Sequence, residues 1–275
     1  MQESGMIAAN GHDLYYETHG EGPPLALVMG IGYDASMWML QQVPVLARSF
    51  RVIVFDNRDA GRSSRASAPY DIGDMADDLA GLLDALEIAR AHVLGVSMGG
   101  MIAQEFALRH PERLDRLVLC ATAAATARSA CDPIRVWNWV KSADSDGAMF
   151  AEQQFVWLFS PRFLRDQEAV AQTRALLASN PHPVAPDAYA RQAAAYLTHD
   201  ALDRLGSVRA PALVVGGERD LLTPPWIVRE VADAIPGARL EILRGEGASH
   251  LLMLERPDEF NALVSEFLLE SDRAQ

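Results

Sequence analysis

A serine stands at a point in the chain where packing alone does not require one. Ser97 lies in the run GVSMG, so Gly95 precedes it by two residues and Gly99 follows it by two. An apolar stretch typical of a buried strand comes before this run, and an amphipathic stretch typical of a helix comes after it. A sharp strand-to-helix turn brings backbone segments so close together that the positions flanking its apex must be small. The pattern predicts an exposed nucleophilic hydroxyl at the apex, although such a serine also suits the simpler role of capping the helix.

A serine hydroxyl is a weak nucleophile at neutral pH and needs a histidine base, which in turn needs an orienting carboxylate. Of the seven histidines, His250 is the one in a glycine-containing loop between the last apolar run and the last amphipathic run. Asp220 follows the preceding apolar run, and Glu218, two residues earlier, is the competing carboxylate. Position relative to the strand end favours Asp220. Ser97, Asp220 and His250 are therefore the candidate catalytic residues.

The tetrahedral intermediate of acyl transfer needs hydrogen-bond donors that face its oxyanion. The backbone N–H of Met98, directly after the serine, is the first candidate. The second is the backbone N–H of Ile31, in the loop after the apolar run LALVMG. Gly30 and Gly32 leave room beside Ile31, although an ordinary tight loop needs the same glycines.

These residues require a sheet that holds them at one edge. Short apolar, β-branched runs alternate with amphipathic runs, which predicts βαβ units on a mostly parallel sheet with helices on both faces. The first two strands read as a hairpin around the turn pair Asn10-Gly11. The stretch 38–50 reads as a helix that is broken or bent near Pro44. Thr223 and Pro224 read as the cap and first residue of a later helix. In such a sheet, the site lies at the carboxyl ends of the strands.

The alternation stops between residues 124 and 205, which are rich in alanine and aromatic residues and contain no clear strand. We expect residues 1–123 and 206–275 to form an α/β core, and residues 124–205 to form a helical lid inserted into it. The lid holds half of the chain's Trp and Phe residues, which suits either a roof over an apolar site or the lid's own core. The candidate pocket residues among them are Trp137, Trp139, Trp157 and Phe159.

Two arginines of this region bear on the substrate. Arg135 and Arg162 are candidate partners for a substrate carboxylate. Surface arginines are more often solvated or paired with acidic side chains. The sequence therefore favours an apolar ester or lactone over a small dicarboxylate.

Composition excludes several classes of partner. The 275-residue chain has a formal net charge of −13, which disfavours nucleic acid and anionic membranes as partners. It starts without a basic region followed by an apolar one, and it contains no run of 18 apolar residues, so we expect a cytoplasmic protein. In that compartment, Cys120 and Cys131 are not expected to form a disulfide. The expected partner is a small molecule, and the expected chemistry uses neither a cofactor nor a metal.

Together these motifs resemble a known family. The chain is similar to lid-bearing α/β-hydrolases of the 3-oxoadipate enol-lactonase type, and the likeness covers nearly the whole core, from IGYDASMW through RVIVFDNRDAGRSS to GASHLLMLERPDEF. Its order Ser, Asp, His along the chain is the order found in α/β-hydrolases. The resemblance assigns Ser97 as nucleophile, Asp220 as acid and His250 as base, with Ile31 and Met98 as oxyanion donors.

Two positions depart from the enol-lactonase pattern. Asp59 stands where the motif after the strand usually has glycine, and Met29 stands where many relatives have histidine. Both features resemble anthracycline-type polyketide methyl esterases of the same superfamily. They leave the candidate triad unchanged and bear only on the substrate.

The sequence leaves more than one activity open. The leading hypothesis is a cofactor-free serine hydrolase that cleaves a carboxylic ester or lactone through an acyl-enzyme. Hydrolysis of a carbon–carbon bond and perhydrolase (haloperoxidase) activity use the same triad and remain alternatives. A hydrolase-fold binding protein is the alternative of another class, but a pure binder has no need of three catalytic residues.

Overall fold

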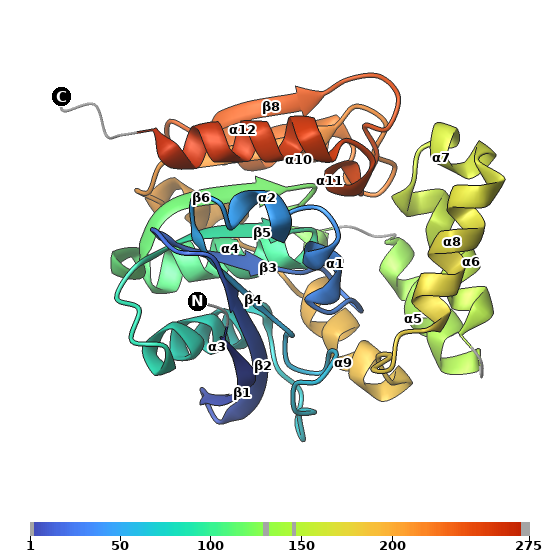
Figure 1. Cartoon of the computed structure of the whole chain (residues 1–275), viewed down its shortest axis with the longest axis horizontal. Coiled ribbons are helices and arrows are strands. Elements are labelled where there is room, and N and C mark those ends of the chain that lie inside the picture. Colours follow the sequence, from blue (N-terminus) through green and yellow to red (C-terminus); the bar gives the residue numbers. More distant parts are fainter. Residues whose placement is uncertain (1–2, 129–131, 145–146, 271–275) are drawn as a thin grey trace.

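The computed structural model describes residues 3–128, 132–144 and 147–270. Within these residues, one sheet of eight strands forms the centre, in the order β1-β2-β4-β3-β5-β6-β7-β8 (Figure 1). Cys131 and the tail 271–275 lie outside the described residues, whereas Cys120 is buried at the end of β6.

The sheet is parallel from β4 to β8, and its first two strands form an antiparallel hairpin. Asn10 and Gly11 both have positive φ angles, 46° and 77°, as expected for the tight turn predicted there. The strands are β1 (Glu3–Ala9), β2 (His12–His19), β3 (Pro24–Val28), β4 (Arg51–Phe55), β5 (Ala91–Val96), β6 (Leu114–Cys120), β7 (Ala212–Gly217) and β8 (Arg239–Leu243). The mostly parallel α/β architecture predicted from the sequence is confirmed.

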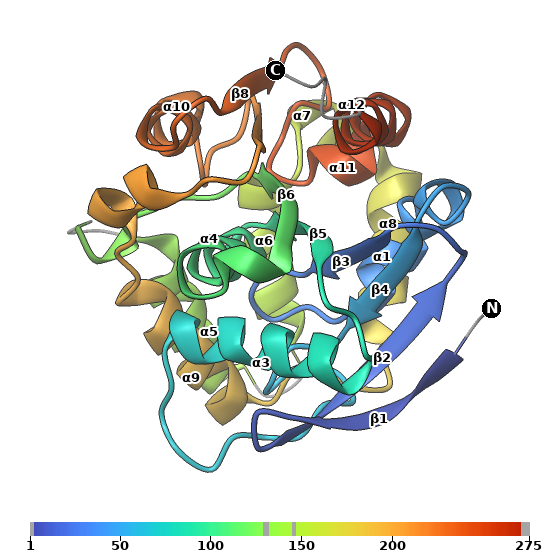
Figure 2. The same cartoon turned by 90° about the vertical axis from the view of Figure 1, so that its left-hand side faces the viewer.

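Helices cover both faces of the sheet because its central strands are apolar on both sides; every residue of β5 is buried. Figure 2 shows α3, α4 and α10 on one face and α12 on the other, and α2 packs against α12. The core helices are α1 (Ser36–Met39), α2 (Val43–Leu46), α3 (Ile72–Ala85), α4 (Met98–Arg109), α10 (Pro225–Ala234), α11 (Leu252–Glu255) and α12 (Pro257–Leu269).

Between β6 and β7, the described residues form helices and no strand of the sheet. These helices are α5 (Pro133–Ala143), α6 (Ala148–Leu158), α7 (Pro161–Arg165), α8 (Gln167–Ala178) and α9 (Pro186–Leu197). We call this helical segment the insertion. Figure 1 shows α5 to α8 beyond the arrowheads of the parallel strands, beside the edge where the candidate site residues lie. None of the described helices is long and apolar enough to cross a membrane.

The helix expected over 38–50 is broken, as one of the two predicted forms: α1 ends at Met39 and α2 begins at Val43. Pro44 lies in the first turn of α2, where its missing N–H costs nothing. The prediction for the start of α10 was wrong. Helix α10 begins at Pro225 rather than at Pro224. Thr223 does not cap it, because the Thr223 side chain bonds to Asp220 instead.

The turn between β5 and α4 is the tightest point of the core. A Cβ atom added to Gly95 would clash with the backbone of Gly99, and a Cβ atom on Gly99 would clash with the carbonyl oxygen of Val28. Backbone atoms cannot move aside as a flexible side chain can. Both positions therefore require glycine for steric reasons, as the GVSMG pattern predicts.

We predict that Gly99→Val lowers the free energy of unfolding by several kcal/mol, because overpacking and backbone strain each cost about 1–3 kcal/mol. Urea denaturation measures the loss. Gly5→Val in β1 is the matched control, because a Cβ atom at Gly5 has no neighbour within 4 Å. Equal stability of the two variants would contradict the tight packing of this turn.

Candidate active site

Ser97 occupies the apex of the turn between β5 and α4. Its backbone has φ 56° and ψ −122°, a conformation that costs free energy for any residue other than glycine. Hydrogen bonds to its backbone hold it there. The Ser97 N–H donates to Cys120 O at 2.9 Å, and Ser97 O accepts from the Thr122 hydroxyl at 2.7 Å and from the N–H groups of Gly100 and Met101 at 2.9 and 3.3 Å. The serine therefore stands at the carboxyl end of β5 and the amino end of α4, where helix N–H groups favour negative charge.

His250 and Asp220 form a buried pair at the same edge of the sheet. His250 lies in the loop between β8 and α11, and Asp220 lies in the loop between β7 and α10. Each residue is 2% exposed, and His250 Nδ1 is 2.9 Å from Asp220 Oδ2. The competing carboxylate, Glu218, points elsewhere and accepts a hydrogen bond from Gly245 N at 2.9 Å.

Other donors also surround Asp220. Its Oδ1 atom accepts from the backbone N–H groups of Leu222 and Thr223 at 2.8 and 2.9 Å, and its Oδ2 atom accepts from the Thr223 hydroxyl at 2.6 Å. Burial alone would raise the pKa of Asp220, but the His250 ring and these hydrogen bonds outweigh it and lower the pKa. Asp220 is therefore an ionised acceptor at neutral pH. The His250 proton then lies on Nδ1, which leaves Nε2 as an acceptor for a hydroxyl.

Thr223 is a site residue that the sequence reasoning missed. Its hydroxyl lies 3.3 Å from His250 Nδ1 as well as 2.6 Å from Asp220. The spacing Asp-x-x-Thr at the end of a strand was the available signal, because an aspartate side chain commonly accepts from amides two and three residues ahead.

The two candidate oxyanion donors lie in buried backbone on either side of Ser97. Met98 opens α4, and Ile31 lies in the loop after β3; both residues are buried. In the described part of the chain, neither backbone N–H donates to a protein acceptor. A Cβ atom on Gly30 would lie 3.2 Å from Ser97 Cβ, so this loop passes directly beside the serine. Buried N–H groups without acceptors suit a site that binds an oxyanion.

The histidine loop also bonds to the insertion. Leu251 N donates to Leu158 O at 3.1 Å. Glu255 accepts from the Ser249 hydroxyl at 2.6 Å and from Ser160 N at 2.8 Å. The residues on both sides of His250 are thus fixed to the end of α6.

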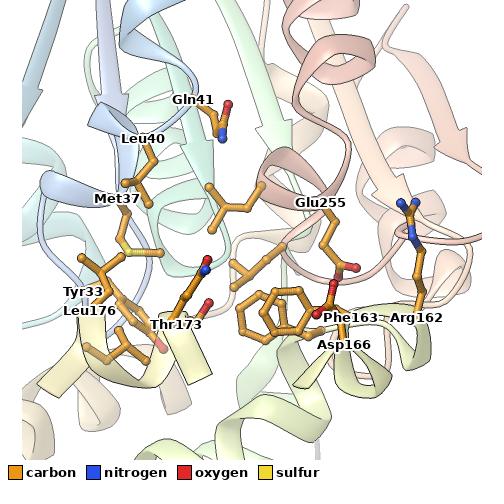
Figure 3. Close-up of a pocket in the computed structure, with 15 residues that line it drawn as sticks. Tyr33, Met37, Leu40, Gln41, Arg162, Phe163, Asp166, Thr173, Leu176 and Glu255 are labelled. Atoms are coloured by element: carbon orange, nitrogen blue, oxygen red, sulfur yellow. The ribbon is translucent and has the colours of Figure 1, made fainter. Parts of the chain in front are cut away.

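A cavity of about 500 Å³ begins next to His250, between the core and the insertion. Leu251 and Tyr33 line it on the core side, and Phe159 and Leu176 line it on the insertion side (Figure 3). Its lining is mainly apolar, and the rings of Phe159 and Phe163 stack with centroids 4.0 Å apart. Figure 3 shows the Arg162 guanidinium at the edge of this group, pointing away from the apolar side chains.

A second apolar cavity, of about 640 Å³, borders the aspartate loop. Thr223 and Leu222 line its core side, and Trp157 and Tyr196 line its insertion side. Neither this cavity nor the one beside His250 has Ser97 among its lining residues, so each adjoins the triad through a neighbouring residue.

The four aromatic pocket candidates divide into two groups. Phe159 and Trp157 each line one of the two apolar cavities. Trp137 is buried and Trp139 is 70% exposed, and neither lines these cavities. Since the two residues are two positions apart on α5, they face nearly opposite sides of the helix. Trp139 therefore lies on the surface and lines neither of the two apolar cavities.

No group of three or more His, Cys, Asp or Glu side chains among the described residues could hold a metal ion. The groups gathered at this sheet edge are a hydroxyl, an imidazole, a carboxylate and backbone amides. Groups of these types, brought together, are capable of nucleophilic acyl transfer.

Comparison with known proteins identifies the fold family. Residues 23–257 match the family model of the alpha/beta hydrolase fold. The crystal structure of the enol-lactonase from Burkholderia xenovorans LB400 superposes with a TM-score of 0.86 at 33% sequence identity, covering 97% of this chain and 100% of that one.

Two relatives carry other names. A protein of Azorhizobium caulinodans named as a carbamate hydrolase is 31% identical over 261 residues, which is 95% of this chain and 97% of that protein. A Mycobacterium tuberculosis protein named as a non-heme bromoperoxidase is 33% identical over 258 residues, 93% of this chain and 97% of its own. The resemblance to enol-lactonases read from the motifs is confirmed, and the chain belongs to the α/β-hydrolase family.

Proposed function

We propose that this protein is a serine hydrolase that cleaves a carboxylic ester or lactone through an acyl-enzyme, without a cofactor. The observation that carries the proposal is the buried His250–Asp220 pair, with a 2.9 Å bond, at the edge where Ser97 stands in a strained backbone conformation. A strained residue and a buried carboxylate both cost stability, and a catalytic role accounts for their presence together.

In this mechanism, Ser97 Oγ attacks the substrate carbonyl carbon while His250 Nε2 takes the hydroxyl proton. Asp220 holds the Nδ1–H group and stabilises the imidazolium that forms. The N–H groups of Met98 and Ile31 bind the oxyanion of the tetrahedral intermediate. His250 then gives the proton to the leaving oxygen, and the acyl-enzyme remains. A water molecule activated by His250 releases the acid and restores Ser97.

The insertion supplies most of the substrate-binding surface in this proposal. We assign residues 124–205 the role of a lid, because the apolar cavity beside His250 is closed on one side by Phe159 and Leu176. Its volume of about 500 Å³ fits the range of small-molecule pockets, which are mainly apolar with few polar groups. An apolar acyl or lactone substrate fits that lining better than a dicarboxylate, because the carboxylates of Asp166 and Glu255 line the cavity together with Arg162 and would repel a second negative charge.

A second activity has support from one relative. The Mycobacterium tuberculosis relative is named as a bromoperoxidase. If hydrogen peroxide replaces water in the deacylation step, the same acyl-enzyme yields a peracid and free Ser97. The test compares two rates: the rate of peracid formation from an ester and hydrogen peroxide, and the rate of hydrolysis of the same ester in water. The ratio of the two rates shows which activity is the faster.

We expect Ser97→Ala to remove ester turnover while the protein stays folded. The equivalent change in subtilisin lowers kcat by about 10⁶-fold. Hydrolysis of p-nitrophenyl butyrate and circular dichroism are the two measurements. Activity within about tenfold of the wild type would rule out Ser97 as the nucleophile.

Asp220→Asn should lower kcat by about 10³–10⁴-fold with little change in folding, because an amide holds the imidazole in the wrong tautomer. Glu218→Gln is the matched control on the same loop, and it should change kcat by less than about tenfold. The reverse result, a damaging Glu218→Gln and a mild Asp220→Asn, would assign the acid to Glu218.

Leu176→Trp should fill part of the cavity beside His250. We expect the ratio of kcat/KM for p-nitrophenyl octanoate over the acetate to fall by about tenfold, since the acetate does not reach that far. Leu269→Trp, on an exposed position of α12, is the control. Equal losses on both esters would show that the cavity does not hold the acyl chain.

A further inference from the structure

The loop that carries Ile31 is held by side chains from two different parts of the molecule. From the core, Asn57 Nδ2 donates to Met29 O at 3.0 Å, and Asp56 accepts from Ala35 N at 2.8 Å. From the insertion, Gln192 Oε1 accepts from Gly32 N at 2.9 Å. The insertion therefore bonds directly to the residue after the proposed oxyanion donor.

Gln192 makes this contact from a fully buried position on α9. Its amide is used at both ends, because Nε2 donates to Arg58 O at 3.0 Å while Oε1 accepts from Gly32. The side chain thus bridges the loop after β3 and the loop after β4. Tyr189, one turn earlier on α9, packs its ring against Gly32, where a Cβ atom would lie 2.8 Å from ring atom Cε2.

The neighbouring Arg191, which is partly exposed, fixes α9 to the core through an ion pair with the buried Asp59. Its Nε and Nη2 atoms donate to the two carboxylate oxygens of Asp59 at 2.8 and 2.6 Å. Asp59 has a buried side chain and a φ angle of 65°, in the region that favours glycine. Strain of this kind costs on the order of 1–3 kcal/mol, and a bidentate arginine pair is among the stronger polar contacts that offset it.

Asp59 is the position where the sequence departs from the glycine usual in the related motif. The departure and the ion pair explain each other: a glycine there would relieve the backbone but would leave Arg191 without its buried partner. The residue is therefore part of the contact between α9 and the core.

We propose that Gln192 is a positioning residue for the oxyanion hole, held in place by the Asp59–Arg191 ion pair. The inference rests on the proposed serine-hydrolase function. The peptide group that carries the Ile31 N–H lies between two others that are each fixed by a side chain, Met29 C=O by Asn57 and Gly32 N–H by Gln192. Fixing both neighbours restricts the rotation of the Ile31 N–H, so the donor is oriented before the substrate arrives. The insertion thereby completes the oxyanion hole in addition to covering it.

The direct test is Gln192→Met, which keeps the length of the side chain and removes both hydrogen bonds. We expect kcat for p-nitrophenyl butyrate to fall about 10–100-fold with KM within about twofold, because the lost orientation matters most in the transition state. Affinity for phenylboronic acid, which forms a tetrahedral adduct with a serine hydroxyl, should fall in parallel. Affinity for a non-reactive amide analogue of the ester should not change.

Two further variants keep the result interpretable. Gln192→Glu retains an acceptor for Gly32 N–H and should recover most of the kcat lost in Gln192→Met. Gln167→Met, the same substitution at an exposed position of the insertion, should behave as the wild type. If Gln192→Met fails to fold, the boronate affinity and kcat of Arg191→Met test the same contact, and both should fall.

Wild-type kcat and boronate affinity in Gln192→Met would overturn the inference and leave the serine-hydrolase proposal intact. So would a loss of boronate and amide-analogue affinity by the same factor, because a general loss of structure affects both ligands. Turnover that persists in Ser97→Ala would instead overturn the proposed function itself.

Discussion

The backbone conformation at Ser97 is the constraint on which the rest of the site depends. A φ angle of 56° places Ser97 at the apex of a sharp turn between β5 and α4. This turn requires glycine at positions 95 and 99, because a Cβ atom at either position would clash with neighbouring backbone. Once the apex is fixed there, every other group must reach it from the same edge of the sheet. The loops after β3, β7 and β8 do so, and they carry Ile31, Asp220 and His250.

The insertion is bonded to two of these loops. Leu158 and Ser160 bond to residues around His250, and Gln192 bonds to the loop of Ile31. If the insertion only covered a cavity, apolar contacts between the insertion and the core would be enough to hold it. These hydrogen bonds couple the position of the insertion to the orientation of the proposed base and of one proposed oxyanion donor. In the proposed function, movement of the insertion therefore changes catalysis as well as access.

Local spacing was enough to predict where the candidate residues lie. GVSMG predicted Ser97 at a turn between a strand and a helix, and the strand-end positions predicted Asp220 and His250 at the same edge, because in a parallel sheet every strand ends there. Their catalytic roles belong to the proposed function. Prediction from neighbouring residues failed at positions where a contact with a distant part of the chain decides how a side chain is used. The Thr223 hydroxyl bonds to Asp220 instead of capping α10. Trp139 faces solvent although Trp137, two residues away, is buried.

Gln192 marks the limit of such prediction. The residue lies 160 positions from Gly32, and nothing in its neighbours along the chain indicates that its amide bridges two loops of the core. Asp59 gave a partial signal, because a charged residue in place of glycine needs a partner, but the sequence does not name Arg191 as that partner. Contacts between the insertion and the core therefore required the structure.

The most direct measurement of the central claim is covalent labelling with a fluorophosphonate, followed by intact-mass and peptide mass spectrometry. The account predicts one equivalent of adduct on Ser97 in the wild type, and labelling slowed by several orders of magnitude in His250→Ala. An adduct on another residue, or equally fast labelling without His250, would contradict it.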